Sequence, residues 1–101
     1  MHDVIVLYNQ PTDPAAFDAH YRGTHVPLVD AMPQIREFAW GKVIDGDHYV
    51  VARMTYNSSE EAAASMASPA GVAAVDDLAN FAQAGVTVLN VVRADTEDEK
   101  R

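Results

Sequence analysis

The stretch REFAWGKVIDGDHYVVARMTY, residues 36–56, decides the fold. It contains two runs rich in aromatic and β-branched residues, Arg36 to Ile44 and His48 to Tyr56, and both runs predict strands. Between them lies Asp45-Gly46, a dipeptide suited to a two-residue turn because both residues tolerate positive φ. The stretch therefore predicts an antiparallel hairpin with a tight turn at Asp45-Gly46.

A strand and a helical region flank this hairpin on each side. Val4 to Tyr8 is a short β-branched strand, and Asp13-Pro14 then supplies an N-cap and a proline for the first helical position. After the hairpin, residues 58–61 have the form of a capping box, and Val86 to Val92 is the last strand. The order β-α-β-β-α-β predicts an α+β, ferredoxin-like fold, with a four-stranded antiparallel sheet and helices on one face.

The second helical region is broken in two at Ser68-Pro69, which caps a further helix. The apolar residues of this last helix are Val72, Val75, Leu78, Ala79 and Ala82.

The strands Val4 to Tyr8 and Val86 to Val92 are apolar on both faces. Helices cover only one face of a ferredoxin-like sheet, so the other face would leave a large apolar patch on a soluble monomer, which is rare. A chain of 101 residues also buries only about two thirds of its unfolded surface. The pattern therefore predicts a homodimer packed sheet to sheet.

Composition excludes several classes of function. Fifteen acidic against seven basic residues give a net charge of −8, which argues against nucleic acid or an anionic membrane as partner. There is no cysteine, so disulfides and cysteine nucleophiles are absent. No Gly-rich phosphate loop is present, and the first apolar run is too short for a secretory signal or a membrane span. We expect one cytoplasmic domain over residues 1–95 and a disordered acidic tail over 96–101.

A polar cluster precedes the hairpin. Pro27 removes one helical hydrogen bond and clashes with the carbonyl of Gly23, so the helix is expected to end or kink between Gly23 and Val26. Tyr21 and His25, one turn apart, would then face an apolar cavity. Histidine donates or accepts a proton near neutral pH, which predicts His25 as a catalytic acid or base with Tyr21 as its partner.

A structural role is the alternative for His25, which could cap the broken helix end by bonding a freed carbonyl. His20 is expected at the surface. The spacing of five between these histidines does not match the i, i+4 arrangement of zinc ligands, so no metal site is predicted.

Aromatic side chains of the strands are expected to form the apolar wall of a substrate site. Tyr8, Phe38 and Trp40 are the candidates, with Arg53 at the mouth of the cavity. The residues predicted to share one face of the hairpin are Phe38, Trp40 and Ile44, together with Tyr49, Lys42 and Arg53. For Lys42 and Arg53, solvent at the strand ends is the alternative.

The segment DPAAFDAHYRGTHVPLVDAMPQIREF, residues 13–38, resembles the signature of the EthD family, named for ethyl tert-butyl ether degradation. Residues 68–86 resemble the second helical region of that family. Gln34 departs from the pattern, because the family usually places glycine there, and it suggests a type I turn. The positions that match the family spacing are Asp13, Pro14, Phe17, Tyr21, His25, Pro27, Leu28 and Pro33.

This resemblance implies a dimeric α+β barrel. Members are often described as reductases or oxidoreductases and lie near cytochrome P450 ether-degradation systems. Related barrels include cofactor-free monooxygenases, muconolactone isomerases and haem-degrading enzymes. We therefore expect a cofactor-independent oxidoreductase or related proton-transfer enzyme that acts on a small apolar or aromatic compound in catabolic or secondary metabolism. An isomerase is a weaker expectation. The alternative is a non-catalytic carrier or accessory protein for a partner oxygenase such as a cytochrome P450.

Overall fold

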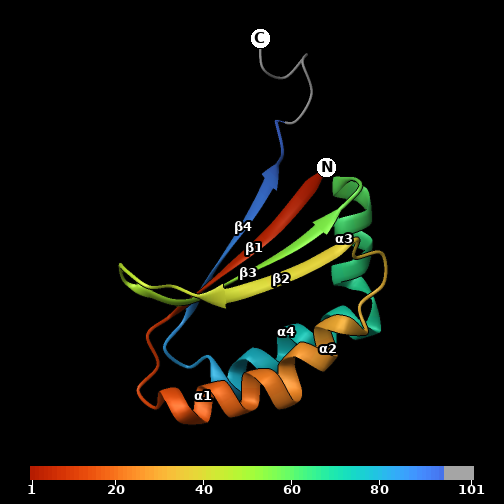
Figure 1. The fold of residues 1–101 in the computed structure, drawn as a ribbon. Coiled ribbons are helices and arrows are strands. Elements are labelled where there is room, and N and C mark those ends of the chain that lie inside the picture. The colour runs from red at the N-terminus through yellow and green to blue at the C-terminus, as the bar shows by residue number, and fades with distance from the viewer. Residues whose placement is uncertain (95–101) are drawn as a thin grey trace.

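A computed structural model describes residues 1–94, and the predicted tail, residues 96–101, lies outside the described residues. The chain forms one antiparallel sheet with its helices packed on one face (Figure 1). Its elements in chain order are β1 (His2–Asn9), α1 (Pro14–His20), the π-helical turn η1 (Tyr21–His25), α2 (Val26–Asp30), β2 (Glu37–Lys42), β3 (His48–Tyr56), α3 (Ser59–Ala67), α4 (Pro69–Phe81) and β4 (Val86–Val92).

The sheet has the strand order β2-β3-β1-β4, and every pair of neighbours is antiparallel. Val4 of β1 lies opposite Met54 of β3 on one side and Asn90 of β4 on the other. This is the predicted ferredoxin-like α+β fold. The two central strands carry the most deeply buried side chains of the sheet, because helices cover them on one face.

The core lies between the sheet and the helices. Alternation along β1 directs its odd-numbered apolar side chains, Ile5 and Leu7, away from the helices and leaves them half-buried. The buried core residues nearest the functional site are Val4, Val6, Tyr8, Phe17, Tyr21, Val29, Ala52, Met54 and Phe81.

The helix through Pro14–Asp30 does not end where the sequence predicted a break. The backbone of Val26 is right-handed helical, and its N–H donates to the carbonyl of Tyr21, five residues earlier. A π-helical turn widens the helix by one residue and so accommodates Pro27, which has no N–H to donate. The helix therefore does not end between Gly23 and Val26, and the distortion predicted there takes the form of a π turn inside a continuous helix.

The hairpin between β2 and β3 is longer at its tip than predicted. Gly46 has a positive φ of 85°, as expected, but Val43 N–H still donates to the Tyr49 carbonyl at 2.9 Å, and β3 begins only at His48. The connection therefore exceeds two residues. Ile44 belongs to this loop and is 97% exposed, so it does not share a face with the aromatic residues of β2.

The turn after α2 also differs from the prediction. Gln34 has a φ of 71°, in the left-handed region. The type I turn expected from the absence of glycine contains no residue with positive φ, so that expectation was wrong. Glutamine therefore adopts a backbone conformation that glycine adopts without steric cost.

Helix α4 presents a different face to the core from the one that its valines suggest. Val72 and Val75 are exposed, and the buried side of the helix instead carries Gly71, Ala74, Asp77 and Phe81. A side chain at position 71 would collide with the backbone carbonyls of α3. Close approach of α3 and α4 at this glycine fixes which face of α4 points inward.

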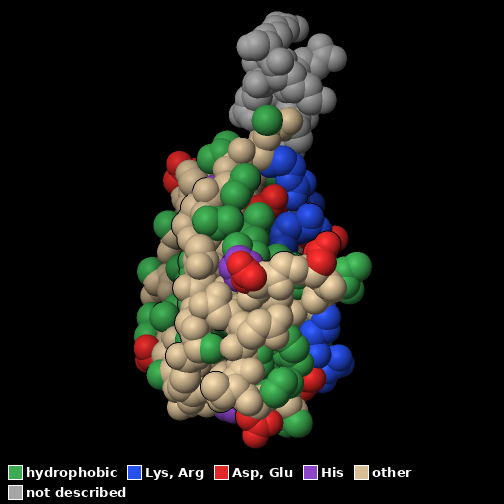
Figure 2. Space-filling view, turned by 90° about the vertical axis from the view of Figure 1, so that its left-hand side faces the viewer, with side chains coloured by type: hydrophobic (Ala, Val, Ile, Leu, Met, Phe, Trp, Pro, Cys, Tyr) green, Lys and Arg blue, Asp and Glu red, His purple; other side chains and the backbone are tan. Residues whose placement is uncertain are grey.

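The outer face of the sheet and the edge strand β4 remain open to solvent in the single chain. Val88, Leu89, Val91 and Val92 are all exposed. On the face shown in Figure 2, Lys and Arg side chains gather along one edge and form no broad patch. Among the described residues, no helix has the length and apolar character needed to cross a bilayer.

Candidate functional site

A small cavity of about 50 Å³ lies between the helices and the sheet. Among the described residues that line it, the side chains with hydrogen-bonding groups are Tyr8, Tyr21 and His25, and the others are apolar. One water needs about 10–15 Å³ of such volume, so the cavity has room for a few waters. Val75 of α4 and Val88 of β4 also line it and are each 46% exposed, which places its mouth between these two elements.

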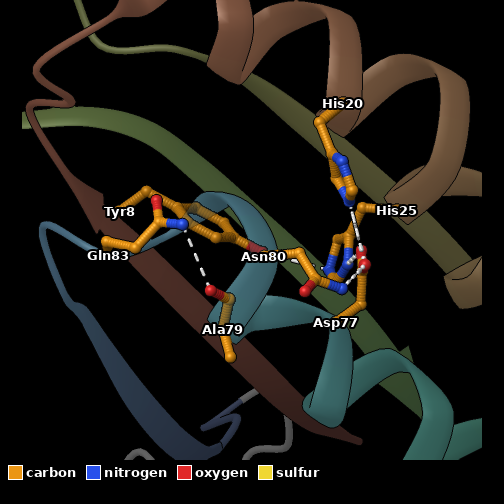
Figure 3. Close-up of polar contacts among 7 residues, drawn as sticks. All are labelled: Tyr8, His20, His25, Asp77, Ala79, Asn80 and Gln83. Atoms are coloured by element: carbon orange, nitrogen blue, oxygen red, sulfur yellow. Dashed lines mark hydrogen bonds and ion pairs between the residues drawn. The ribbon is translucent and has the colours of Figure 1, made fainter.

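His25 is the last residue of the π turn, and its ring is buried at the cavity wall. Nδ1 lies 3.0 Å from Oδ2 of Asp77, and Nε2 lies 3.3 Å from the hydroxyl of Tyr8 (Figure 3). An ionised carboxylate only accepts hydrogen bonds, so this network assigns the proton to Nδ1. Nε2 is then the basic nitrogen, and it accepts the Tyr8 hydroxyl proton. The interpretation of His25 as a helix cap does not describe these contacts.

Asp77 is the shared hydrogen-bond acceptor of the site. It projects from the buried side of α4, and its carboxylate accepts hydrogen bonds from His25, from Nε2 of His20 at 2.8 Å and from Nδ2 of Asn80 at 3.0 Å (Figure 3). Burial opposes ionisation of Asp77. The hydrogen bonds from Asn80, His20 and His25 outweigh that effect and hold the pKa of Asp77 below its ordinary value.

Burial sets the protonation of the groups at the cavity. It lowers the pKa of His25, and Asp77 offsets that shift only in part, so the ring is neutral at pH 7. Burial also raises the pKa of Tyr8 and of Tyr21, which keeps both phenols protonated. At neutral pH the site therefore holds one neutral base and two neutral donors beside a buried carboxylate.

The hydroxyl of Tyr21 is buried and has no hydrogen-bond partner among the described residues. Its ring is held by Phe17, stacked at 5.7 Å between centroids, and by Trp40, edge-on at 4.8 Å. A buried hydroxyl without a partner is uncommon, since it carries the cost of leaving water. Because Tyr21 lines the cavity, this group is available to bond an oxygen of a molecule placed there.

The remaining predicted site residues separate into two groups. Phe38 lines the cavity, whereas Trp40 packs behind Tyr21 and is not part of the wall. Arg53 pairs with Ala39 in the sheet and bonds Glu37 at 2.8 Å, on the face away from the helices. The prediction that Arg53 shares a face with Trp40 was therefore wrong.

Two other polar residues are bound within the structure. Lys42 donates to Asp18 at 3.0 Å and to the hydroxyl of Tyr49 at 2.9 Å. His20 is partly exposed at the surface, and its Nε2 is also bonded to Asp77.

Sequence reasoning missed Asp77 altogether. The available signal was its spacing from Ala74 and Phe81, three residues before and four after, which places an acidic residue on the buried side of a helix. Such a residue requires polar partners in the core. Over residues 1–94, no group of three metal-ligating side chains is arranged to hold a metal ion.

Comparison with known proteins identifies the family. The EthD domain model matches residues 9–85. An 11.0 kDa protein of Rhodococcus erythropolis, from the thcB-thcC intergenic region, is 47% identical over 94 residues, which cover 88% of this chain and 91% of that protein.

Solved structures agree with this assignment. The crystal structure of an EthD family protein from Bacillus halodurans has a TM-score of 0.88 at 30% identity, over 92% of this chain and 98% of that one. A dimeric ferredoxin-like protein of unknown function from Thermobifida fusca shares the fold, with a TM-score of 0.73 at 16% identity over 91% and 90% of the two chains. This chain belongs to the EthD family.

Proposed function

We propose that the cavity binds a small, largely apolar or aromatic molecule and that His25 transfers a proton from it without the help of a cofactor. The observation that carries this proposal is the placement of one buried imidazole between a carboxylate and a cavity. Asp77 holds Nδ1 at 3.0 Å, and Nε2 bonds the hydroxyl of Tyr8, which lines the same cavity. A carboxylate that orients an imidazole in this way stabilises the imidazolium formed when the ring accepts a proton.

The chemistry follows from the positions of the donors. A phenol, enol or similar acidic group enters beside His25 and displaces the long hydrogen bond from Tyr8. Its proton moves to Nε2, the positive charge on the ring is balanced by Asp77, and the substrate oxygen becomes an anion. The unpartnered hydroxyl of Tyr21 can donate to that oxygen. We assign the overall reaction to cofactor-independent oxidoreduction or a related proton-transfer reaction.

The apolar lining governs which molecules can enter. Apart from Tyr8, Tyr21 and His25, the described lining residues carry no side-chain nitrogen or oxygen, so a ligand gains mainly from burial of its apolar surface. A cavity of about 50 Å³ is smaller than an aromatic ring requires. The exposed rim at Val75 and Val88 therefore has to move apart when such a ligand binds.

A non-catalytic carrier or accessory protein for a partner oxygenase, such as a cytochrome P450, is the second candidate. The apolar wall favours it, because such a wall binds a small apolar molecule without any catalytic group. The two functions differ in what His25 does. An enzyme requires its Nε2, whereas a carrier requires only the shape of the ring.

We also propose that two copies pack through the outer faces of their sheets. Ile5 and Leu7 lie on this face, and Leu89, opposite Ile5, is exposed in the single chain. The ferredoxin-like protein from Thermobifida fusca that shares this fold is dimeric, which supports a dimer. Cytoplasmic residence stays a prediction that rests on the absence of cysteine.

Hydroquinone in air-saturated buffer is a suitable probe, because dioxygen then accepts the two electrons and two protons and forms hydrogen peroxide as quinone appears. Ligand-detected NMR measures binding, and an oxygen electrode measures turnover. We expect the wild-type protein to bind hydroquinone and accelerate its oxidation. His25→Gln should bind within a few-fold of wild type and lose about 10²–10⁴ in rate. Tyr21→Phe should bind more weakly.

Binding without turnover in both the wild-type protein and His25→Gln would favour the carrier. Wild-type protein that binds neither hydroquinone nor phenol would contradict both candidates.

A further inference from the structure

Two histidines of unequal exposure share the carboxylate of Asp77. His25 donates from Nδ1 to Oδ2 at 3.0 Å, and His20 places Nε2 at 2.8 Å from Oδ1 and 3.0 Å from Oδ2. The side chain of His25 is 5% exposed, whereas that of His20 is 28% exposed. Figure 3 shows the two rings approaching Asp77 from the same helical segment. One acid in α4 is thus the common partner of a buried and a solvent-accessible base.

The two rings also belong to different spaces. His25 lines the apolar cavity, and His20 lines an open surface cleft of about 440 Å³ between the start of α1 and the end of α4. Asp13 and Asn80 border this cleft as well. The His20 ring is therefore open to solvent at the cleft, while the His25 ring is buried at the cavity wall. Asp77 is the direct link between the two.

We propose that His20 is a positioning residue for His25. It competes for the carboxylate of Asp77 and thereby sets how strongly the cavity histidine holds a proton. When His20 carries a positive charge, it neutralises part of the negative charge that would stabilise an imidazolium at His25. When His20 is neutral, that negative charge acts more fully on His25. The basicity of His25 in the cavity then depends on the charge of His20 at the surface cleft. The catalytic consequence, though not the coupling itself, rests on the proposed function.

Among the described residues, the other titratable groups around His25 do not supply this coupling. Tyr8 from β1 and Tyr21 from η1 contact its ring, and burial keeps both protonated. Asp77 is the ionised group that bonds it, and His20 reaches it through Asp77. Burial has the largest effect on the pKa of His25 and lowers it, Asp77 raises it, and the charge of His20 lowers it. These directions agree with the geometry.

The test is an NMR titration of the histidine ring resonances in the intact protein, which needs no substrate. In His20→Gln, the amide can still donate to Asp77 but cannot become charged. We expect the pKa of His25 to rise by roughly half a unit or more in this variant. Asp77→Asn should lower the pKa of His25. His48→Gln is the matched control, because it removes a histidine that does not bond Asp77, and it should leave His25 unchanged.

Two outcomes would overturn the inference. One is an unchanged pKa of His25 in a folded His20→Gln variant. His20 would then have only a structural role, as a hydrogen bond between α1 and α4. The other is a wild-type His25 resonance that follows a single-site titration curve, with no second inflection from a coupled group. This readout requires no variant. Absence of turnover with hydroquinone would contradict the proposed enzyme but not this coupling. If turnover is found, His20→Gln should move the acidic limb of its pH profile by the same amount as the pKa of His25.

Discussion

We expect the buried ring of His25 to make the stability of this protein depend on pH. Burial lowers the folded-state pKa of His25 below its ordinary value of 6.5, so the folded state binds fewer protons than the unfolded chain. The contribution of neutral His25 to the stability of the folded state is fully present above pH 6.5. It is lost as pH falls through the pKa of His25 in the folded state. We expect the free energy of unfolding, measured by urea titration, to decline as pH is lowered from about 6.5.

His25→Gln is the control for that prediction at the scale of one residue. Glutamine does not titrate, so the decline that begins near pH 6.5 should disappear from its profile. The pKa of Asp77 lies below 3.8, so a second decline should remain at lower pH in the variant. A wild-type profile that stays flat from pH 7 down to pH 5 would contradict the lowered pKa of His25.

At the scale of the elements, the contact between α3 and α4 depends on one glycine. A side chain at Gly71 would collide with the carbonyl oxygens of Ser65 and Met66. Gly71→Ala should therefore destabilise the fold by about 1–3 kcal/mol, because backbone atoms have to shift. Gly23 lies in the π turn with open space around it. Gly23→Ala should stabilise the fold by about 0.5–1 kcal/mol through its effect on the unfolded chain.

Thermal and urea unfolding of these two variants measure the prediction directly. Opposite signs for the same chemical change would show that packing at α3 and α4, and not helix propensity, decides the effect at Gly71. Equal stabilisation by both substitutions would mean that the helices can separate without cost. The same contact explains why Val72, which looks like a core residue in the sequence, is exposed.

At the scale of the whole molecule, the outer sheet face decides the assembly. Leu89 lies on this face opposite Ile5 and is 42% exposed in the single chain, so the fold itself tolerates a polar residue there. In a dimer packed sheet to sheet, Leu89→Asp would bury an unpaired charge at a cost of several kcal/mol. Analytical ultracentrifugation at micromolar concentration should show a wild-type dimer and a folded Leu89→Asp monomer.

Val72→Asp is the control for the assembly prediction, because it places the same charge at an exposed valine of α4. It should leave the dimer intact. Dimers that persist in Leu89→Asp and dissociate in Val72→Asp would place the interface on the helices. If the wild-type protein is a monomer at this concentration, the predicted dimer is wrong.

The sequence alone determined the order of the elements and the fold class, because the signals for both are local. Runs of β-branched and aromatic residues mark β1 and β3, and side-chain caps at Asp13, Ser58 and Ser68 mark where helices begin. Each signal acts within a few residues of the chain, so it can be recognised without knowledge of the tertiary structure. The position of His25 one turn after Tyr21 is local in the same sense.

Only the tertiary structure decided the partners of the site. Asp77 meets His25 and His20 across 52 and 57 residues of chain, and no periodicity predicts such a contact. The face of Arg53 depended on the pairing of β3 with β2, in which a shift of one residue moves a side chain to the other side of the sheet. The π turn arose because the packed helix continues past Pro27 instead of ending there. These features depend on long-range packing, which brings into contact residues that are far apart in the sequence.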